Sequence, residues 1–316
     1  MSLEDQRRAA REMWHLLEPI HAVTYFSDET TAAYKAIGLK GFWQGYFASR
    51  VAPMGAVGGE VCSAVFYNFQ PEMVRRALPS AWSAASPEQV LRARDEALQP
   101  VLAAMFGDDD AIAEAAELAT IAIEGCALEG RALFAGHAAL PPPDDPVLRL
   151  WWAATLLREH RGDGHVAALL ANRIDGLEAH VLVVGSGRLP RELMQTARSW
   201  SDEEWVAAER RLTVRGLIES GVLTGAGAEL RQRIEDTTDD LAVEPWHRLG
   251  EERTHRMAEL LDPLPGCNGS GPSKGRSRAS ATALLVTAPF RTLTPRARAW
   301  SSVVAASGPS VATRTM

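Results

Sequence analysis

Apolar side chains recur every three to four residues along most of the chain, and this spacing predicts α-helices rather than strands. The first such stripe, in residues 4–26, contains Met13, Leu16, Leu17, Ile20 and Val23. Pro19 lies inside this stripe, so we expect the helix to kink or restart there. The pattern as a whole predicts an all-α, mainly helical protein.

Serine and aspartate residues stand before several of these stripes, where a helix N-cap is expected. Ser27 precedes one predicted helix, and Ser86 precedes another that has proline at its first position. Asp175 precedes GLEAHVLVV, and Ser201 is followed three residues later by Glu204, which is the spacing of a capping box.

The clearest interruption of the helical pattern is PPPDDP, residues 141–146. Consecutive prolines cannot continue a helix, so we place a domain boundary there, between an N-terminal helical unit (1–140) and a second unit (147–262). Residues 263–316 change composition abruptly and hold no acidic residue. We expect this tail to be disordered, or to come from an aberrant reading frame.

A second break is predicted inside LLREHRGDGHVAALL, residues 156–170. Gly162 and Gly164 favour a tight turn, and Asp163 would then cap a helix that begins at Gly164. The predicted order is helix, turn, helix, turn, helix, which is a tri-helical arrangement.

A short strand is predicted at Val222-Leu223-Thr224, between a helix after Ser201 and a long helix after Thr224. The stretch RRLTVRGLIESGVLTGAGAELRQRIE resembles the end of a MarR-type winged helix, with a very short wing. We therefore expect two helical units, of which the second is winged-helix-like and carries a short β-wing.

Residues 7–262 also resemble an actinobacterial helix-turn-helix family that includes SalK. The stretches that carry this resemblance are EPIHAVTYFSDE (18–29), GYFASRVAPMG (45–55), FYNFQPEMV (66–74), LPSAW (78–82) and REHRGDGHVAAL (158–169). The resemblance implies a helix-turn-helix fold and a role in transcriptional regulation, and it transfers no catalytic residue.

The net charge of −7 is unevenly distributed. The tail after Asp262 carries seven basic residues, which leaves 26 basic and 40 acidic residues in 1–262, a net charge of −14. Residues 196–246 contain six arginines and eleven acids. Because phosphate backbones are bound through basic faces, this charge disfavours DNA as a partner without excluding it.

Several sequence features that would indicate a membrane, secreted or metal-binding protein are missing. No apolar run reaches the ~18 residues of a membrane span, and MSLEDQRRAAREMW has no apolar core of a signal peptide. Cys62, Cys126 and Cys267 show no metal-ligand spacing. We expect a cytoplasmic protein with reduced cysteines, no membrane partner, no metal and no cofactor.

The histidine-rich stretch has three interpretations. His160, Asp163 and His165 could form a metal site, although their spacing is unusual for one. Alternatively, Asp163 caps a turn beside partly exposed histidines, or Glu159, His160, Arg161 and His165 hold a polar ligand. We expect both histidines to face one shared polar cavity.

A second candidate group consists of two pairs that each share a helical face. These pairs are His21 with Tyr25, and Tyr46 with Arg50. Aromatic walls with one fixed cation suit an anionic or planar ligand, whereas the structural alternative is an aromatic helix interface. Asn68 could contact the same ligand.

Motifs of nucleophilic, phosphate-binding or metalloprotease sites are missing from the sequence. We therefore favour a helix-turn-helix-derived protein that binds a small polar or aromatic ligand and has a regulatory role. The alternatives are a MarR-like DNA-binding regulator, and an enzyme that uses His160, Asp163 and His165. Whether the chain forms a homodimer stays open.

Overall fold

The computed structural model describes residues 3–107, 110–262 and 264. The expected disordered or aberrant tail and Cys267 lie outside the described residues. The described part is mainly helical and contains a two-stranded sheet, which confirms the predicted all-α fold with a short β-wing.

The first half of the chain folds into short and long helices that precede the proline-rich segment. They are α1 (Leu3–Phe26), α2 (Asp28–Ala36), α3 (Gly41–Val51), η1 (Ala52–Met54), α4 (Gly59–Phe66), α5 (Pro71–Ala77), η2 (Ser80–Ser83), α6 (Pro87–Phe106), α7 (Asp110–Ile123) and α8 (Ala132–Ala138). Helix α1 runs through Pro19, so the chain does not restart a helix there.

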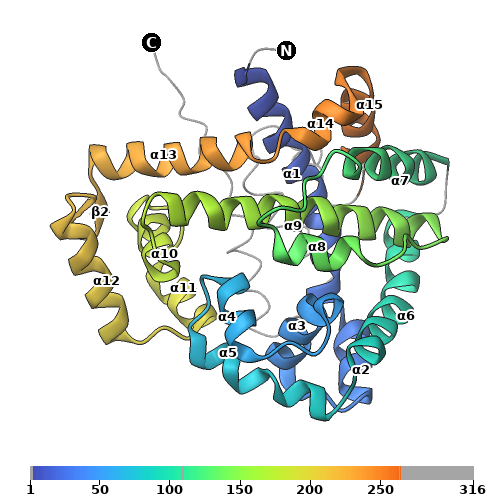
Figure 1. The fold of residues 1–316 in the computed structure, drawn as a ribbon, viewed down its shortest axis with the longest axis horizontal. Coiled ribbons are helices and arrows are strands. Elements are labelled where there is room, and N and C mark those ends of the chain that lie inside the picture. The colour runs from blue at the N-terminus through green and yellow to red at the C-terminus, as the bar shows by residue number, and fades with distance from the viewer. Residues whose placement is uncertain (1–2, 108–109, 263, 265–316) are drawn as a thin grey trace, which may run out of the picture.

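The second half is organised around one long helix. Its elements are α9 (Pro146–Ala171), α10 (Gly176–Gly185), α11 (Arg191–Arg198), α12 (Asp202–Val214), β1 (Ile218–Glu219), β2 (Val222–Leu223), α13 (Gly225–Asp240), α14 (Glu244–Leu249) and α15 (Glu251–Leu261). In Figure 1, α9 crosses the molecule with α13 alongside it, and α10, α11 and α12 gather at one end.

Four of the predicted helix caps are confirmed. The hydroxyl of Ser27 accepts a hydrogen bond from the Thr30 backbone N–H, and reciprocal capping boxes form at Ser86, Asp175 and Ser201. Each cap satisfies backbone donors that a helix leaves open in its first turn.

The wing is a minimal antiparallel hairpin. Ile218 pairs with Leu223 and Glu219 with Val222. The two residues between the strands, Ser220 and Gly221, both have positive φ, of 50° and 79°. A two-residue turn of this kind matches the right-handed twist of the strands and leaves no long loop to project.

The predicted turn at Gly162-Asp163-Gly164 is wrong, because α9 continues through it from Pro146 to Ala171. Residues on both sides are buried in the fold, and a Cβ atom on Gly164 would lie 2.9 Å from Arg131 Nη1 and 3.2 Å from Leu241 Cβ. Gly164 therefore serves close helix packing rather than a change of chain direction. Local glycine propensity is overridden by tertiary contacts.

The two glycines of α9 should respond oppositely to alanine. A Cβ atom on Gly162 would have only ordinary contacts, the nearest being Glu159 Oε2 at 3.6 Å. We expect Gly162→Ala to raise the free energy of unfolding by about 0.5–1 kcal/mol, because alanine is the better helix former. We expect Gly164→Ala to lower it by about 1–3 kcal/mol through steric overlap. Urea denaturation measures both, and a loss of stability in both variants would contradict the continuous helix.

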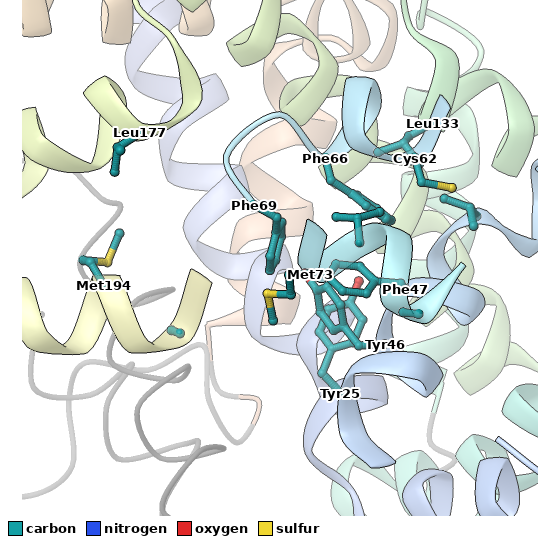
Figure 2. Close-up of a cluster of buried hydrophobic side chains, with 14 of the residues drawn as sticks. Tyr25, Tyr46, Phe47, Cys62, Phe66, Phe69, Met73, Leu133, Leu177 and Met194 are labelled. Atoms are coloured by element: carbon teal, nitrogen blue, oxygen red, sulfur yellow. The ribbon is translucent and has the colours of Figure 1, made fainter. Parts of the chain in front are cut away.

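Two buried clusters form the core, and each draws on residues from both sides of 141–146. One contains side chains from the middle and second half of α1, from α7, from the first half of α9 and from α15. The other is aromatic in its centre, where Tyr25, Tyr46, Phe47, Phe66 and Phe69 lie together (Figure 2). The division of the chain into residues 1–140 and 147–262 stays a prediction.

No helix in the described part of the chain combines the length and apolarity that crossing a bilayer requires.

Candidate ligand-binding site

A buried ion-pair network links α1, α3 and α9. Glu159 accepts hydrogen bonds from Arg50 Nη2 at 2.9 Å and from Arg158 Nη1 at 2.9 Å. Arg158 Nε also donates to Glu18 at 3.3 Å. Burial alone would raise the pKa of Glu159, but Arg158 and Arg50 together hold this pKa well below its usual range.

The predicted group of His21, Tyr25, Tyr46 and Arg50 is brought together by this network. Arg50 Nη1 donates to the Tyr46 hydroxyl at 3.0 Å, and the Tyr25 and Tyr46 ring centroids are 4.7 Å apart. Tyr25 and Tyr46 line a small cavity of about 100 Å³. The four side chains are at most 7% exposed, so they form a packed, hydrogen-bonded cluster rather than an open pocket.

The hydrogen bonds of His21 define its tautomer. The Thr155 hydroxyl donates to the Trp151 carbonyl oxygen, so His21 Nδ1 donates to Thr155 Oγ1 at 3.0 Å. His21 Nε2 then accepts from the Tyr25 hydroxyl at 2.9 Å. Burial lowers the pKa of His21 well below its ordinary value, so the ring is neutral.

Asp163 caps a helix, although a different one from the helix that the sequence predicts. Its Oδ2 accepts from the Phe134 backbone N–H at 3.0 Å, at the start of α8. The prediction that it caps a helix beginning at Gly164 is wrong, because Asp163 lies within α9. The carboxylate reaches across the fold to supply the side-chain cap that Arg131, the residue before α8, does not provide.

The environment of Asp163 predicts a pH-dependent stability. Burial raises its pKa to about 6 from 3.8. Because this pKa is higher in the folded than in the unfolded chain, ionisation of Asp163 destabilises the fold. The destabilisation is absent below pH ~4 and reaches about 3 kcal/mol above pH ~6. Asp163→Asn keeps the acceptor oxygen without this charge. We therefore expect the asparagine variant to gain stability relative to the unmodified chain as the pH rises from 4 to 7. Urea unfolding at several pH values tests this, and a difference that does not vary with pH would contradict it.

The histidines of the same stretch do not face one cavity, so that prediction is wrong. His160 packs edge-on against Phe134 and lines a pocket of about 10 Å³, whereas His165 Nδ1 donates to Thr238 Oγ1 at 2.9 Å. Residues five positions apart on a continuous helix point in different directions. His160, Asp163 and His165 therefore do not converge, and no metal-ligand cluster occurs among the described residues.

Several charged side chains surround a cavity of about 230 Å³, which we call the arginine cavity. Five helices contribute to its wall: α1, α9, α10, α11 and α13. Its charged residues are Arg158, Arg161, Arg198, Arg231, Glu18 and Glu235. The lining residues alone therefore carry a positive formal charge, and two carboxylates outside the lining, Glu159 and Asp239, pair with Arg158 and Arg161.

Arg161 has unused hydrogen-bonding capacity. Its Nη2 lies 2.7 Å from Asp239 Oδ1, and its guanidinium lies 5.1 Å from the Trp14 ring centroid. Its Nη1 is buried with no hydrogen-bond partner among the described residues. A buried donor of this kind costs free energy unless a ligand or water accepts from it.

Arg198 enters the same cavity from α11. Its guanidinium lies 4.3 Å from the Phe69 ring centroid, and burial lowers its pKa to about 9. The lowered pKa means that burial destabilises the charged form of Arg198. An anion bound in the cavity would stabilise this charged form by electrostatic attraction.

Neutral polar groups and apolar side chains complete the wall. His180 Nε2 donates to the Asn68 carbonyl oxygen at 3.0 Å, and burial lowers the pKa of His180 to about 3. Leu182, Met194 and Ile234 supply apolar surface. The cavity therefore combines cations with an apolar wall.

The sequence predicted part of this site. Of the ten candidate residues, Asn68, Arg161 and His165 line the arginine cavity. Glu159 contacts it through Arg158. Sequence reasoning missed Glu18, Arg158, His180, Arg198 and Arg231, although Arg158 lies within the histidine-rich stretch 156–170.

The three helices α10, α11 and α12, followed by the hairpin, have the order of a helix-turn-helix domain with a short wing. The chain belongs to a helix-turn-helix family, whose family model matches residues 10–266. No curated protein and no solved structure matches the chain. Membership indicates a regulatory role, and DNA is the usual partner of such a domain.

Proposed function

We propose that this protein is a regulator that responds to a small organic anion held in the arginine cavity. The observation that carries the proposal is the cavity wall, where four arginines oppose two glutamates beside apolar side chains. Guanidinium groups bind carboxylates with directional hydrogen bonds, and Arg161 holds a buried donor available for one. The volume of about 230 Å³ fits a ligand of about one substituted ring.

A ligand in this cavity would contact the helix-turn-helix region directly. Met194 and Arg198 belong to α11, and Ala179, His180 and Val183 belong to α10. The cavity also contacts α13, which follows the hairpin. A ligand that binds one arrangement of these helices more tightly than another would shift the protein toward that arrangement, which is the requirement for a regulatory response.

Isothermal titration calorimetry of the full chain with benzoate and benzamide tests the proposal, because the two share a ring and differ in charge. We expect benzoate to bind with 1:1 stoichiometry and benzamide at least tenfold more weakly. Arg161→Gln should weaken benzoate binding by at least tenfold while the chain stays folded, because Arg11 still pairs with Asp239.

The matched control is Arg210→Gln, which removes the same charge from an exposed position on α12. It should leave benzoate affinity unchanged. Equal binding of benzoate and benzamide, or equal benzoate affinity in Arg161→Gln and the unmodified chain, would refute the anion site.

DNA binding is the second candidate function, and membership of a helix-turn-helix family favours it. Its MarR type is proposed from the sequence resemblance alone. The physical difficulty is α12, whose first turn carries Asp202, Glu203 and Glu204. Arg211 on this helix is already paired with Asp175 and Glu178 of the α10 capping box. The partners of the chain in a MarR-like arrangement would be DNA and a second copy of itself.

We expect the chain to bind duplex DNA weakly at ~150 mM salt, because few arginines of α12 remain available to neutralise phosphates. Fluorescence anisotropy on genomic fragments at several salt concentrations measures this. Nanomolar, sequence-specific binding with a steep salt dependence would instead support the MarR-type function.

A further inference from the structure

A larger cavity lies against another part of α11. Its volume is about 550 Å³, and it is lined by α3, α5, η2 and α11. It meets Thr196, Ala197 and Ser199 of the α11 end, whereas the arginine cavity meets Met194 and Arg198. We call it the α3–α11 cavity.

Apolar side chains from three helices form much of the wall. They are Trp43 of α3, Met73 and Ala77 of α5, and Ala197 of α11. Met73 belongs to the aromatic core cluster, where it lies beside Phe69 in Figure 2. The polar residue Gln44 is already engaged, since its Oε1 accepts from the Lys40 backbone N–H at 2.6 Å and its Nε2 donates to Ser80 Oγ at 2.9 Å. This wall suits a flat or extended apolar body.

The charges of the wall have one sign. Lys40 and Arg76 line the cavity, and none of the described lining residues is acidic. Neighbouring Arg75 differs, because it is paired with Glu60 and Glu72. Among the described residues, no carboxylate lies within ion-pair distance of Lys40 or Arg76. The two cations are thus available to a ligand.

The cavity also adjoins the turn that leads into α12. Ser199 lines it and adopts a left-handed conformation, with φ 60° and ψ 30°. The next residue, Trp200, donates from Nε1 to the Asn68 carbonyl oxygen at 3.2 Å, and Asn68 lines the arginine cavity. A ligand here would therefore contact Ser199 of the α11–α12 turn, which does not line the arginine cavity.

We propose that the α3–α11 cavity is a second, independent binding site, which takes an amphipathic organic monoanion. The carboxylate or sulfonate of the ligand faces Lys40 and Arg76, and its apolar body packs on Trp43 and Met73. Both cavities suit anions, and the larger volume distinguishes this ligand from the smaller anion of the arginine cavity.

Fluorescence titration of the full chain with two dyes tests this site. The probes are 8-anilinonaphthalene-1-sulfonate and N-phenyl-1-naphthylamine, which share their aromatic rings and differ in the sulfonate. We expect saturable binding of the sulfonate at one site, and binding of the neutral dye at least tenfold more weakly. The double variant Lys40→Gln, Arg76→Gln should lose at least tenfold in sulfonate affinity and keep its affinity for the neutral dye.

Three further variants give the comparison its controls. Arg75→Gln removes an adjacent surface charge outside the cavity wall and should not affect binding, and Arg161→Gln in the arginine cavity should not affect it either. Thr196→Trp, which replaces an exposed residue of the wall with a larger one, should weaken both dyes. The proposal would be overturned if the two dyes bound with similar affinities, or if no saturable binding occurred. It would also be overturned if the double variant kept its sulfonate affinity while Arg161→Gln lost it. A lack of saturable binding would leave this face to a macromolecular partner.

Discussion

Glutamine in place of Glu159 is expected to lower the free energy of unfolding by about 3–5 kcal/mol. Glu159 is 1% exposed and is the shared acceptor of Arg50 and Arg158. The neutral amide leaves two buried cations with less opposing charge, and an uncompensated buried charge is among the most destabilising changes a core can receive.

Urea denaturation of the two chains measures this loss, and Glu124→Gln provides the control. Glu124 pairs with Arg248 at the surface, where both side chains are more than half exposed. We expect the control to lose no more than about 1 kcal/mol. Similar losses in the two variants would show that the Glu159 network contributes no more than a surface ion pair.

Alanine in place of Gly176 is the second change with a large expected effect. A Cβ atom there would lie 2.0 Å from the Tyr67 carbonyl oxygen and 2.8 Å from Asn68 Cα. Neither contact can be relieved by rotating a side chain, so α10 or the 67–68 segment must move. We expect a loss of about 3 kcal/mol or more, at or above the upper range for overpacking.

Gly225→Ala is the matched control for this substitution. Gly225 also opens a helix, α13, and a Cβ atom there would meet nothing within 4 Å. Its stability should change by no more than about 0.5 kcal/mol. Thermal melts of both variants decide the matter, and an unaltered melting temperature for Gly176→Ala would mean that α10 does not pack this closely on Tyr67.

Those features of the fold that depend on neighbouring residues could be predicted from the sequence. Ser201 and Glu204 form their capping box because both partners lie within one helical turn. The strand at Val222–Leu223 was predicted from a short apolar pair and the short wing from the MarR-type resemblance, whereas the partner strand Ile218–Glu219 was not predicted. The turn at Gly162 failed for the opposite reason, since the contacts that keep α9 continuous come from Arg131 and Leu241.

In the candidate site too, contacts between residues close in sequence could be predicted and contacts between distant residues could not. His21 with Tyr25 and Tyr46 with Arg50 could be paired from their spacing, and the structure brings all four together. The partner of Arg50 could not be predicted, because Glu159 is 109 positions away. Arg198 and Arg231 gave no signal, since each is one of several arginines and only the convergence of α11 and α13 places them at one cavity.

The most direct test of the central claim is a crystal structure of the full chain with 4-bromobenzoate, with the bromine located by anomalous scattering. We expect a bromine peak inside the arginine cavity, with the carboxylate within hydrogen-bond distance of Arg161 Nη1. A bromine peak confined to other parts of the molecule, or no peak in crystals soaked at concentrations that saturate the protein in solution, would contradict it.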